Sequence, residues 1–345
     1  MPGDRRQEHD RKEPNMGGGS FSYDTYSRVA SLRSALPVNQ VFTQSVAQEI
    51  HPDLDPEGVK VRESCDSPEH PESNAVAIWF DQTGSMGQAP ELFAKGKLEP
   101  LMRMLIAKGY LDHPQILYGA FGDFSDREGI VQVGQFESDN RMDDCLTKLW
   151  LVANGGGQSH ESSELAFYFM ARHTKIDCFD KRGKKGYMFL VTDEAGYSHV
   201  SASQVREIFG DKLEAYISLE SIIEEVRERF EVFLVYLETG AYGPAATAKI
   251  MDGWKEIFGE RFLLLKDPAD VSELISTTIG LCEGREVDSI TKDLTAAGAT
   301  PGTIRAVTTA LVPYAASAKA TGLTRATVTG SLPAVAGQGG RTRRI

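Results

Sequence analysis

The chain has 345 residues, of which 41% are apolar, so it is long enough to bury a core as one large domain or two smaller ones. Its formal net charge of −12 argues against nucleic acid as the main partner, because contacts to phosphate supply most of that affinity. No apolar stretch approaches the roughly 20 residues that cross a bilayer. The four cysteines form no CxxC pair, so we expect a soluble protein of the reducing cytoplasm, without a zinc knuckle or a disulfide framework.

The composition changes along the chain and predicts five segments. Residues 1–20 hold almost no apolar side chains and mix both charge signs, which predicts a disordered arm rather than a secretory signal. Residues 21–74 predict a partly ordered extension and linker. At the other end, the sequence of residues 284–330 predicts a small helical appendage, in which Thr300 caps a helix. The composition of residues 331–345 predicts a disordered basic tail.

Residues 75–283 alternate strands and helices. The runs AVAIWF, YMFLV and VFLVYL lack polar alternation, as expected for strands that helices cover on both faces. This order predicts an α/β fold with a doubly wound, mostly parallel central sheet. The expected elements are a strand at 75–80, a helix at 90–108 broken at Pro100, strands at 115–121 and 129–136, helices at 140–152 and 161–173, a strand at 187–192, helices at 202–209 and 219–230, a strand at 232–237, a helix at 244–258, a strand at 261–265 and a helix at 268–281.

Polar residues follow two of the buried strands directly. Asp81 and Asp193 each stand after such a strand, and ligands of doubly wound sheets bind beyond the carboxyl ends of the strands. After Asp81, the hydroxyls of Thr83 and Ser85 come at alternate positions across a tight turn. Hard oxygen ligands of this kind suit Mg²⁺ or Mn²⁺. We therefore expect a metal site with an open position for water or an outside carboxylate.

These residues resemble the von Willebrand factor A (vWA) domains and their metal-ion-dependent adhesion site. That site has a DxSxS loop after the first strand, a threonine from a later loop and an aspartate after the fourth strand. Here DQTGS and VTDE are similar to the first and last parts, and the likeness covers roughly residues 70–283. The loop NGGGQSHES is similar to the threonine-bearing turn, but Gly157 stands at the threonine position, so Ser159 or Gln158 is the candidate ligand there.

The stretch that leads into the first strand is similar to uncharacterised bacterial and phage members of this superfamily. The resemblance implies an intracellular protein-interaction module rather than an enzyme. Asp81, Thr83, Ser85 and Asp193 would hold Mg²⁺ or Mn²⁺, and the metal would bind an acidic side chain of a protein partner. The resemblance also implies a place in a larger assembly or beside an AAA+ ATPase.

Two other interpretations stay open. DQTGS also resembles the DxTGT loop of haloacid-dehalogenase-like phosphatases, in which Asp81 would be the nucleophile of a Mg²⁺-dependent phosphohydrolase or phosphotransferase. GDFSD at 122–126 is similar to that family's second acidic motif, although it comes early in the chain. The third interpretation is a structural scaffold with this fold and no metal.

Two further residues have both a functional and a structural interpretation. Asp123 ends a strand at the same edge. It either contacts the residues that bind the metal, without binding the metal itself, or caps a turn. Ser159 either binds the metal or caps the helix expected to begin near Glu161.

Overall fold

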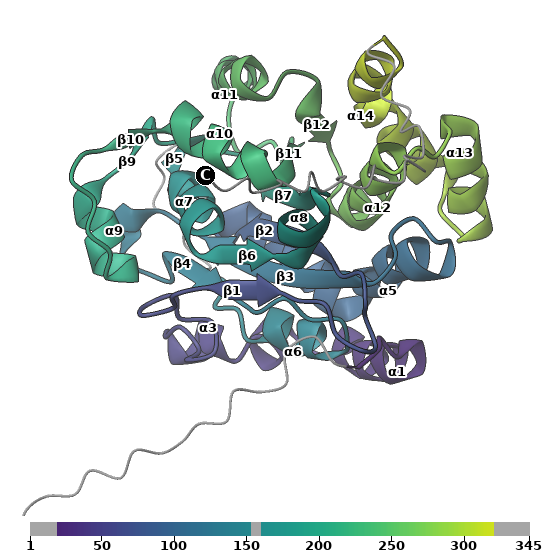
Figure 1. The fold of residues 1–345 in the computed structure, drawn as a ribbon, viewed down its shortest axis with the longest axis horizontal. Helices are drawn as coiled ribbons and strands as arrows, with labels where there is room; N and C mark the ends of the chain where they lie inside the picture. Colours follow the sequence, from purple (N-terminus) through teal and green to yellow (C-terminus); the bar gives the residue numbers. More distant parts are fainter. Residues whose placement is uncertain (1–18, 153–159, 321–345) are drawn as a thin grey trace, which may run out of the picture.

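The computed structural model describes residues 19–152 and 160–320 (Figure 1). Predictions for residues 1–18 of the N-terminal arm, for the tail at 331–345 and for Gly157, Gln158 and Ser159 therefore lie outside the described residues.

A six-stranded sheet forms the centre of the molecule. Its spatial order is β12-β11-β7-β2-β3-β4, and every neighbouring pair is parallel except β3 and β4. Taken from β4, the six strands follow the chain order 3-2-1-4-5-6 of doubly wound folds, and this order reverses between β2 and β7. The predicted fold class is confirmed. The strands are β2 (Asn74–Asp81), β3 (Pro114–Phe121), β4 (Val131–Val133), β7 (Gly186–Thr192), β11 (Phe230–Leu237) and β12 (Phe262–Leu265).

The absence of polar alternation in the strands follows from two cores, one on each face of the sheet. Every residue of β2 is buried: Ile78 and Phe80 point into one core, and Ala77 and Trp79 point into the other. Side chains of α5, α12 and the terminal helices α1 (Tyr23–Ser34), α13 (Val287–Ala296) and α14 (Pro301–Ala320) belong to the first core, and those of α7, α8, α9, α10 and α11 to the second. The helices of the central region are α4 (Gln88–Leu92), α5 (Leu98–Met102), α6 (Arg141–Thr147), α7 (Ser163–Arg172), α8 (Asp177–Arg182), α9 (Ala202–Phe209), α10 (Leu219–Arg229), α11 (Pro244–Phe258) and α12 (Val271–Cys282).

The helix predicted at 90–108 is irregular, but not at the predicted place. Pro100 lies inside α5, whereas Gly96 has non-helical backbone angles, φ 158° and ψ −21°. A proline ring clashes with the carbonyl four residues earlier and donates no hydrogen bond to it. The disturbance therefore falls one turn before Pro100, at Gly96.

The helix predicted at 140–152 ends early, at Thr147. Residues 150–152 are not helical because their backbone has other partners: Trp150 N donates to Gln132 Oε1 (2.8 Å), and Val152 N donates to the Gln82 carbonyl (3.3 Å). Gly84 N in turn donates to the Val152 carbonyl (3.2 Å). This segment thus holds the loop that follows β2.

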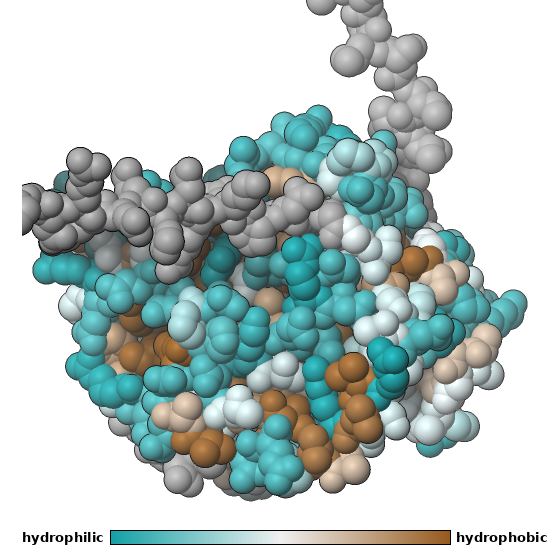
Figure 2. All heavy atoms as spheres, turned by 90° about the horizontal axis from the view of Figure 1, so that it is seen from below, coloured by the Kyte–Doolittle hydropathy of each residue, from teal (hydrophilic) through white to brown (hydrophobic). Residues whose placement is uncertain are grey.

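The N-terminal extension packs against the first core. It contains α1 (Tyr23–Ser34), α2 (Val38–Val41), α3 (Gln44–Ala47) and β1 (Arg62–Ser64), and β1 pairs with β6 (Thr174–Ile176). Tyr26 and Phe42 are fully buried there. The face on which α1, α3 and α6 lie in Figure 1 is mostly hydrophilic in Figure 2, with apolar side chains in small separate groups.

The C-terminal helices α13 (Val287–Ala296) and α14 (Pro301–Ala320) lie beside α12 at one end of the molecule (Figure 1). As predicted, Thr300 caps α14, because its hydroxyl accepts from Thr303 N (3.1 Å). Leu294 and Val307 are fully buried in the first core, so these helices contribute to the main core. Within the described part of the chain, no helix has the length and apolar character required to span a lipid bilayer.

Candidate metal-binding site

The two aspartates singled out in the sequence lie on neighbouring strands. Asp81 is the last residue of β2, and Asp193 directly follows β7. These strands pair in parallel, and the sheet order reverses between them, so both carboxylates lie at the edge where doubly wound folds bind ligands. Both residues are buried, with 0% and 3% of their surface exposed.

Hydroxyl groups surround the Asp81 carboxylate. Its Oδ1 accepts from Thr83 N (3.0 Å) and Thr83 Oγ1 (2.8 Å), and its Oδ2 accepts from Thr192 Oγ1 (2.9 Å). The structure therefore places the Thr83 hydroxyl beside Asp81, and its role as a metal ligand stays a prediction. Thr192, the last residue of β7, was not predicted; its only sequence signal is its position directly before Asp193.

Glu161 is a second carboxylate at the Thr83 hydroxyl, and the sequence did not reveal it. Thr83 Oγ1 lies 2.9 Å from Glu161 Oε1 as well as 2.8 Å from Asp81 Oδ1. Glu161 was expected in the first turn of a helix, but α7 begins at Ser163, and Glu161 belongs to the short strand β5 (His160–Glu161). β5 pairs with β8 (Ala195–Gly196), which directly follows the acidic pair Asp193 and Glu194.

The loop after β11 contributes two more hydroxyls to this edge. Thr239 donates from its hydroxyl to Asp193, and Tyr242 donates from its hydroxyl to Glu194. Three consecutive parallel strands, β2, β7 and β11, therefore supply side chains to one edge of the sheet.

Asp123 caps a turn next to this cluster. Its side chain accepts from Ser125 N (2.9 Å), at the start of the turn Phe124–Asp126, and from the Tyr197 hydroxyl (3.0 Å). Of the two interpretations given to Asp123, capping is the one for which the structure shows a contact. The predicted contact with metal ligands stays a prediction.

The carboxylates at this edge raise one another's pKa. Burial and the charge of Asp193 raise the pKa of Asp81, and burial and the charge of Asp81 raise the pKa of Glu161. Burial, with Asp193 and Asp123 nearby, raises the pKa of Glu194 to about 7 although the Tyr242 hydroxyl opposes this shift. The negative charges concentrated here favour either protons or a cation.

The side chains present fit a hard divalent cation. Two buried carboxylates and the Thr83 hydroxyl offer oxygen ligands of the kind that Mg²⁺ and Mn²⁺ prefer. Across residues 19–152 and 160–320, no three His, Cys, Asp or Glu side chains converge so as to hold a metal by themselves, so hydroxyls and an outside ligand would have to complete the site. Ser85 belongs to the turn Gly84–Gly87, but its side chain, like Ser159, lies outside what the structure describes.

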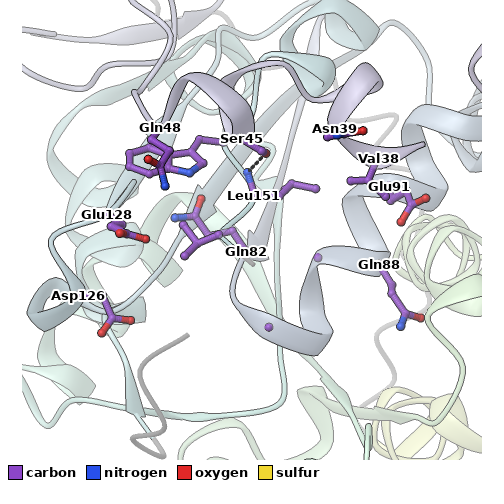
Figure 3. A pocket seen from close by; sticks show the side chains of 14 residues that line it. Val38, Asn39, Ser45, Gln48, Gln82, Gln88, Glu91, Asp126, Glu128 and Leu151 are labelled. Atoms are coloured by element: carbon purple, nitrogen blue, oxygen red, sulfur yellow. Dashed lines mark hydrogen bonds between the residues drawn. The ribbon is translucent and has the colours of Figure 1, made fainter. Parts of the chain in front are cut away.

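A cavity of about 670 Å³ opens beside the loop that follows Asp81 (Figure 3). In Figure 3, Gln82 lies at its centre, with Asp126 and Glu128 on one side and Glu91 on the other. The helices α2 and α3 of the N-terminal extension form another wall, with Val38 among their lining residues. None of the described residues that line the cavity is cationic.

No protein-family model matches the chain, and neither does any curated protein sequence. Two solved structures with a similar arrangement are forms of the pilus adhesin SpaC from Lactobacillus rhamnosus GG. The open conformation matches with 12% sequence identity and a TM-score of 0.40, and a second form with 11% and 0.42. Each match covers 69% of this chain and 31% of the adhesin. At this degree of similarity, function has to be argued from this chain's own residues.

Proposed function

We propose that the protein is a metal-dependent protein-interaction module of the vWA type. Asp81, Thr83 and Asp193, with Ser85 from the same loop, would hold Mg²⁺ or Mn²⁺, and a carboxylate of a protein partner would complete the coordination of the ion. The observation that supports this proposal best is the position of the two aspartates on β2 and β7, on either side of the point where the sheet order reverses.

The chemistry of these residues supports a binding role. The bound cation would supply an electrophilic centre for an outside carboxylate. Hydroxyl ligands add no negative charge, so they leave the ion able to attract that carboxylate. Thr192 orients Asp81 by donating to its Oδ2, and Thr239 does the same for Asp193. Fixed ligands of this kind lose little conformational entropy when the ion binds.

The cavity beside the site narrows the choice of partner. Its carboxylates Asp126 and Glu128 repel further negative charge, whereas Glu91 is paired with Lys95 (2.7 Å). A partner segment that enters it beside the metal would therefore be neutral or basic around the one carboxylate that binds the ion. An AAA+ ATPase or another component of a larger assembly remains the expected class of partner, from the sequence resemblance alone.

Thermal unfolding in EDTA and in millimolar Mg²⁺ or Mn²⁺ tests the metal site. An ion that binds only the native state stabilises it by about 2.7 kcal/mol at a hundredfold excess over Kd. We expect this shift in the wild type and its loss in Asp81→Asn, a substitution that keeps the size of the side chain. Asp180→Asn, at an exposed position of α8, is the matched control and should retain the shift. Absence of a shift in the wild type would contradict the proposal and favour a metal-free scaffold.

The phosphohydrolase hypothesis makes a different prediction. It requires Asp81 to attack a phosphoryl group, yet Asp81 is fully buried, and an incoming phosphate would meet the carboxylates of Glu161 and Asp193. Hydrolysis of p-nitrophenyl phosphate that needs Mg²⁺ and is abolished in Asp81→Asn would support this alternative over the binding module.

A further inference from the structure

We propose that Glu161 is a third carboxylate ligand of the cation held at Asp81, in place of the threonine that this chain lacks at Gly157. The inference rests on the proposed metal site and deepens it, because it assigns a ligand from the loop NGGGQSHES, in which the sequence indicated Ser159 or Gln158 as the candidate ligand and Glu161 only as the start of a helix. It also determines how a partner's carboxylate would reach the ion.

The first support is the hydroxyl of Thr83, which lies between two carboxylates. Oγ1 is 2.8 Å from Asp81 Oδ1 and 2.9 Å from Glu161 Oε1, but a hydroxyl has only one proton to donate. One of the two contacts therefore joins two acceptor oxygens unless a carboxyl group carries a proton. A cation removes this conflict because all three oxygen atoms can act as its ligands.

The second support is the burial of Glu161. Only 3% of its surface is exposed, and its Oε2 has no hydrogen-bond partner. A buried acceptor without a partner costs about 1–3 kcal/mol, and more when the group is charged. An ion at this position would satisfy the oxygen that the rest of the described protein leaves without a donor.

The third support is the backbone that carries Glu161. β5 pairs in parallel with β8, and Glu161 lies opposite Gly196, three residues after Asp193. The pairing therefore holds Glu161 beside the loop that carries the second aspartate. Asp81 and Glu161 flank the Thr83 hydroxyl, but among the described residues no three carboxylates converge as a set. The Glu161 side chain would therefore have to move toward the ion when it binds.

A cation with three carboxylate ligands has a consequence for the partner. The three negative charges of the carboxylates exceed the two positive charges of the ion by one. An outside carboxylate therefore has to displace Glu161 in order to bind. Removing the charge of Glu161 should therefore have opposite effects on the two binding steps. It should weaken the binding of the cation and strengthen the binding of a carboxylate to the cation-loaded protein.

Calorimetric titration of the full chain with Mn²⁺ tests the first effect. We expect Glu161→Gln to bind Mn²⁺ about tenfold more weakly than the wild type or worse, since ligand charge sets the affinity of such sites. Glu164→Gln is the matched control: Glu164 lies three residues further along the chain, in the first turn of α7, and is fully buried, but the carboxylates that the Thr83 hydroxyl contacts are those of Asp81 and Glu161. It should bind Mn²⁺ as the wild type does.

Titration of the Mn²⁺-loaded proteins with glutarate tests the second effect, and Glu161→Gln should bind glutarate several-fold more tightly than the wild type. If Glu161→Gln binds Mn²⁺ as the wild type does, or if Glu164→Gln loses as much affinity, Glu161 is not a ligand, and the proposed function still stands. If the wild type itself binds no Mn²⁺, both proposals fail. Should Glu161→Gln not fold, Glu161→Asp replaces it, and unchanged Mn²⁺ and glutarate affinities of this shortened carboxylate would overturn the inference.

Discussion

At the scale of single residues, Gly119 shows how closely the central strands are packed. Gly119 on β3 lies opposite Trp79 on β2, and the indole covers the space where a side chain would stand. A Cβ atom at position 119 would lie 2.5 Å from Cε3 of Trp79. Trp79 is fully buried and belongs to the second core, so it has little room to move away. The glycine is therefore required by the tryptophan beside it.

We expect Gly119→Ala to destabilise the protein by about 1–3 kcal/mol, the usual cost of overpacking a core. Gly253→Ala is the matched control. Gly253 lies in α11, is exposed, and a Cβ there would meet nothing within 4 Å, so alanine should stabilise the helix by about 0.5–1 kcal/mol. Urea unfolding of both variants measures the two effects, and a neutral Gly119→Ala would contradict the packing argument.

At the scale of elements, the irregular helix around Gly96 depends on a neighbour from the N-terminal extension. The Tyr26 hydroxyl on α1 donates to the Phe93 carbonyl (2.6 Å) and accepts from Leu98 N (3.3 Å). These two backbone groups lie on either side of Gly96, where the regular helical pattern is interrupted. Leu98 N also donates to the Phe93 carbonyl, so the Tyr26 hydroxyl adds a side-chain partner to both groups at this irregular turn. This contact ties the extension to the sheet domain.

We therefore expect Tyr26→Phe to cost about 0.5–1.5 kcal/mol, the usual net contribution of one hydrogen bond, because the Phe93 carbonyl keeps Leu98 N as a donor. Tyr23→Phe on the same helix is the control. Tyr23 also donates to a carbonyl, that of Met102 (3.1 Å), but it is only partly buried, so water can replace its hydroxyl at lower cost. Denaturant unfolding should rank the loss in Tyr26→Phe above that in Tyr23→Phe. Equal losses would mean that the bridge across Gly96 has no special role.

At the scale of the whole molecule, the first core joins segments from both ends of the described chain. Tyr26 of α1, Phe80 of β2, Leu274 of α12 and Leu294 of α13 are all fully buried in it. A core built from such distant segments favours unfolding as one cooperative unit. The domain boundaries predicted at residues 74 and 284 stay predictions, but the packing crosses both of them.

Leu294→Ala tests this cooperativity. Removing a fully buried leucine from α13 should cost about 2–5 kcal/mol of the stability of the whole chain, in a single transition. Leu32→Ala on α1 should cost little, because Leu32 is 69% exposed. Unfolding followed both by circular dichroism and by tryptophan fluorescence measures the outcome. Early, separate melting of α13 and α14, with the tryptophan signal unchanged, would show instead that the C-terminal helices are an independent appendage.

The sheet could be predicted from the sequence because burial on both faces leaves a local signature. The expected strand at 232–237 matches β11, which begins two residues earlier, and the helices expected at 202–209 and 244–258 match α9 and α11. The helix at 140–152 was predicted too long. Its last residues pair with Gln132, Gln82 and Gly84, which are distant in sequence, so no local pattern could indicate its end.

The sequence by itself determined the doubly wound fold and the position of Asp81 and Asp193 at one edge of the sheet. It could do so because the carboxyl ends of parallel strands lie together in any such fold. Only the tertiary structure decided that Glu161 contacts the Thr83 hydroxyl and that Thr192 and Thr239 donate to the two aspartates. These contacts join residues tens of positions apart, and they depend on loop pairings, such as that of β5 with β8, which have no periodic signature.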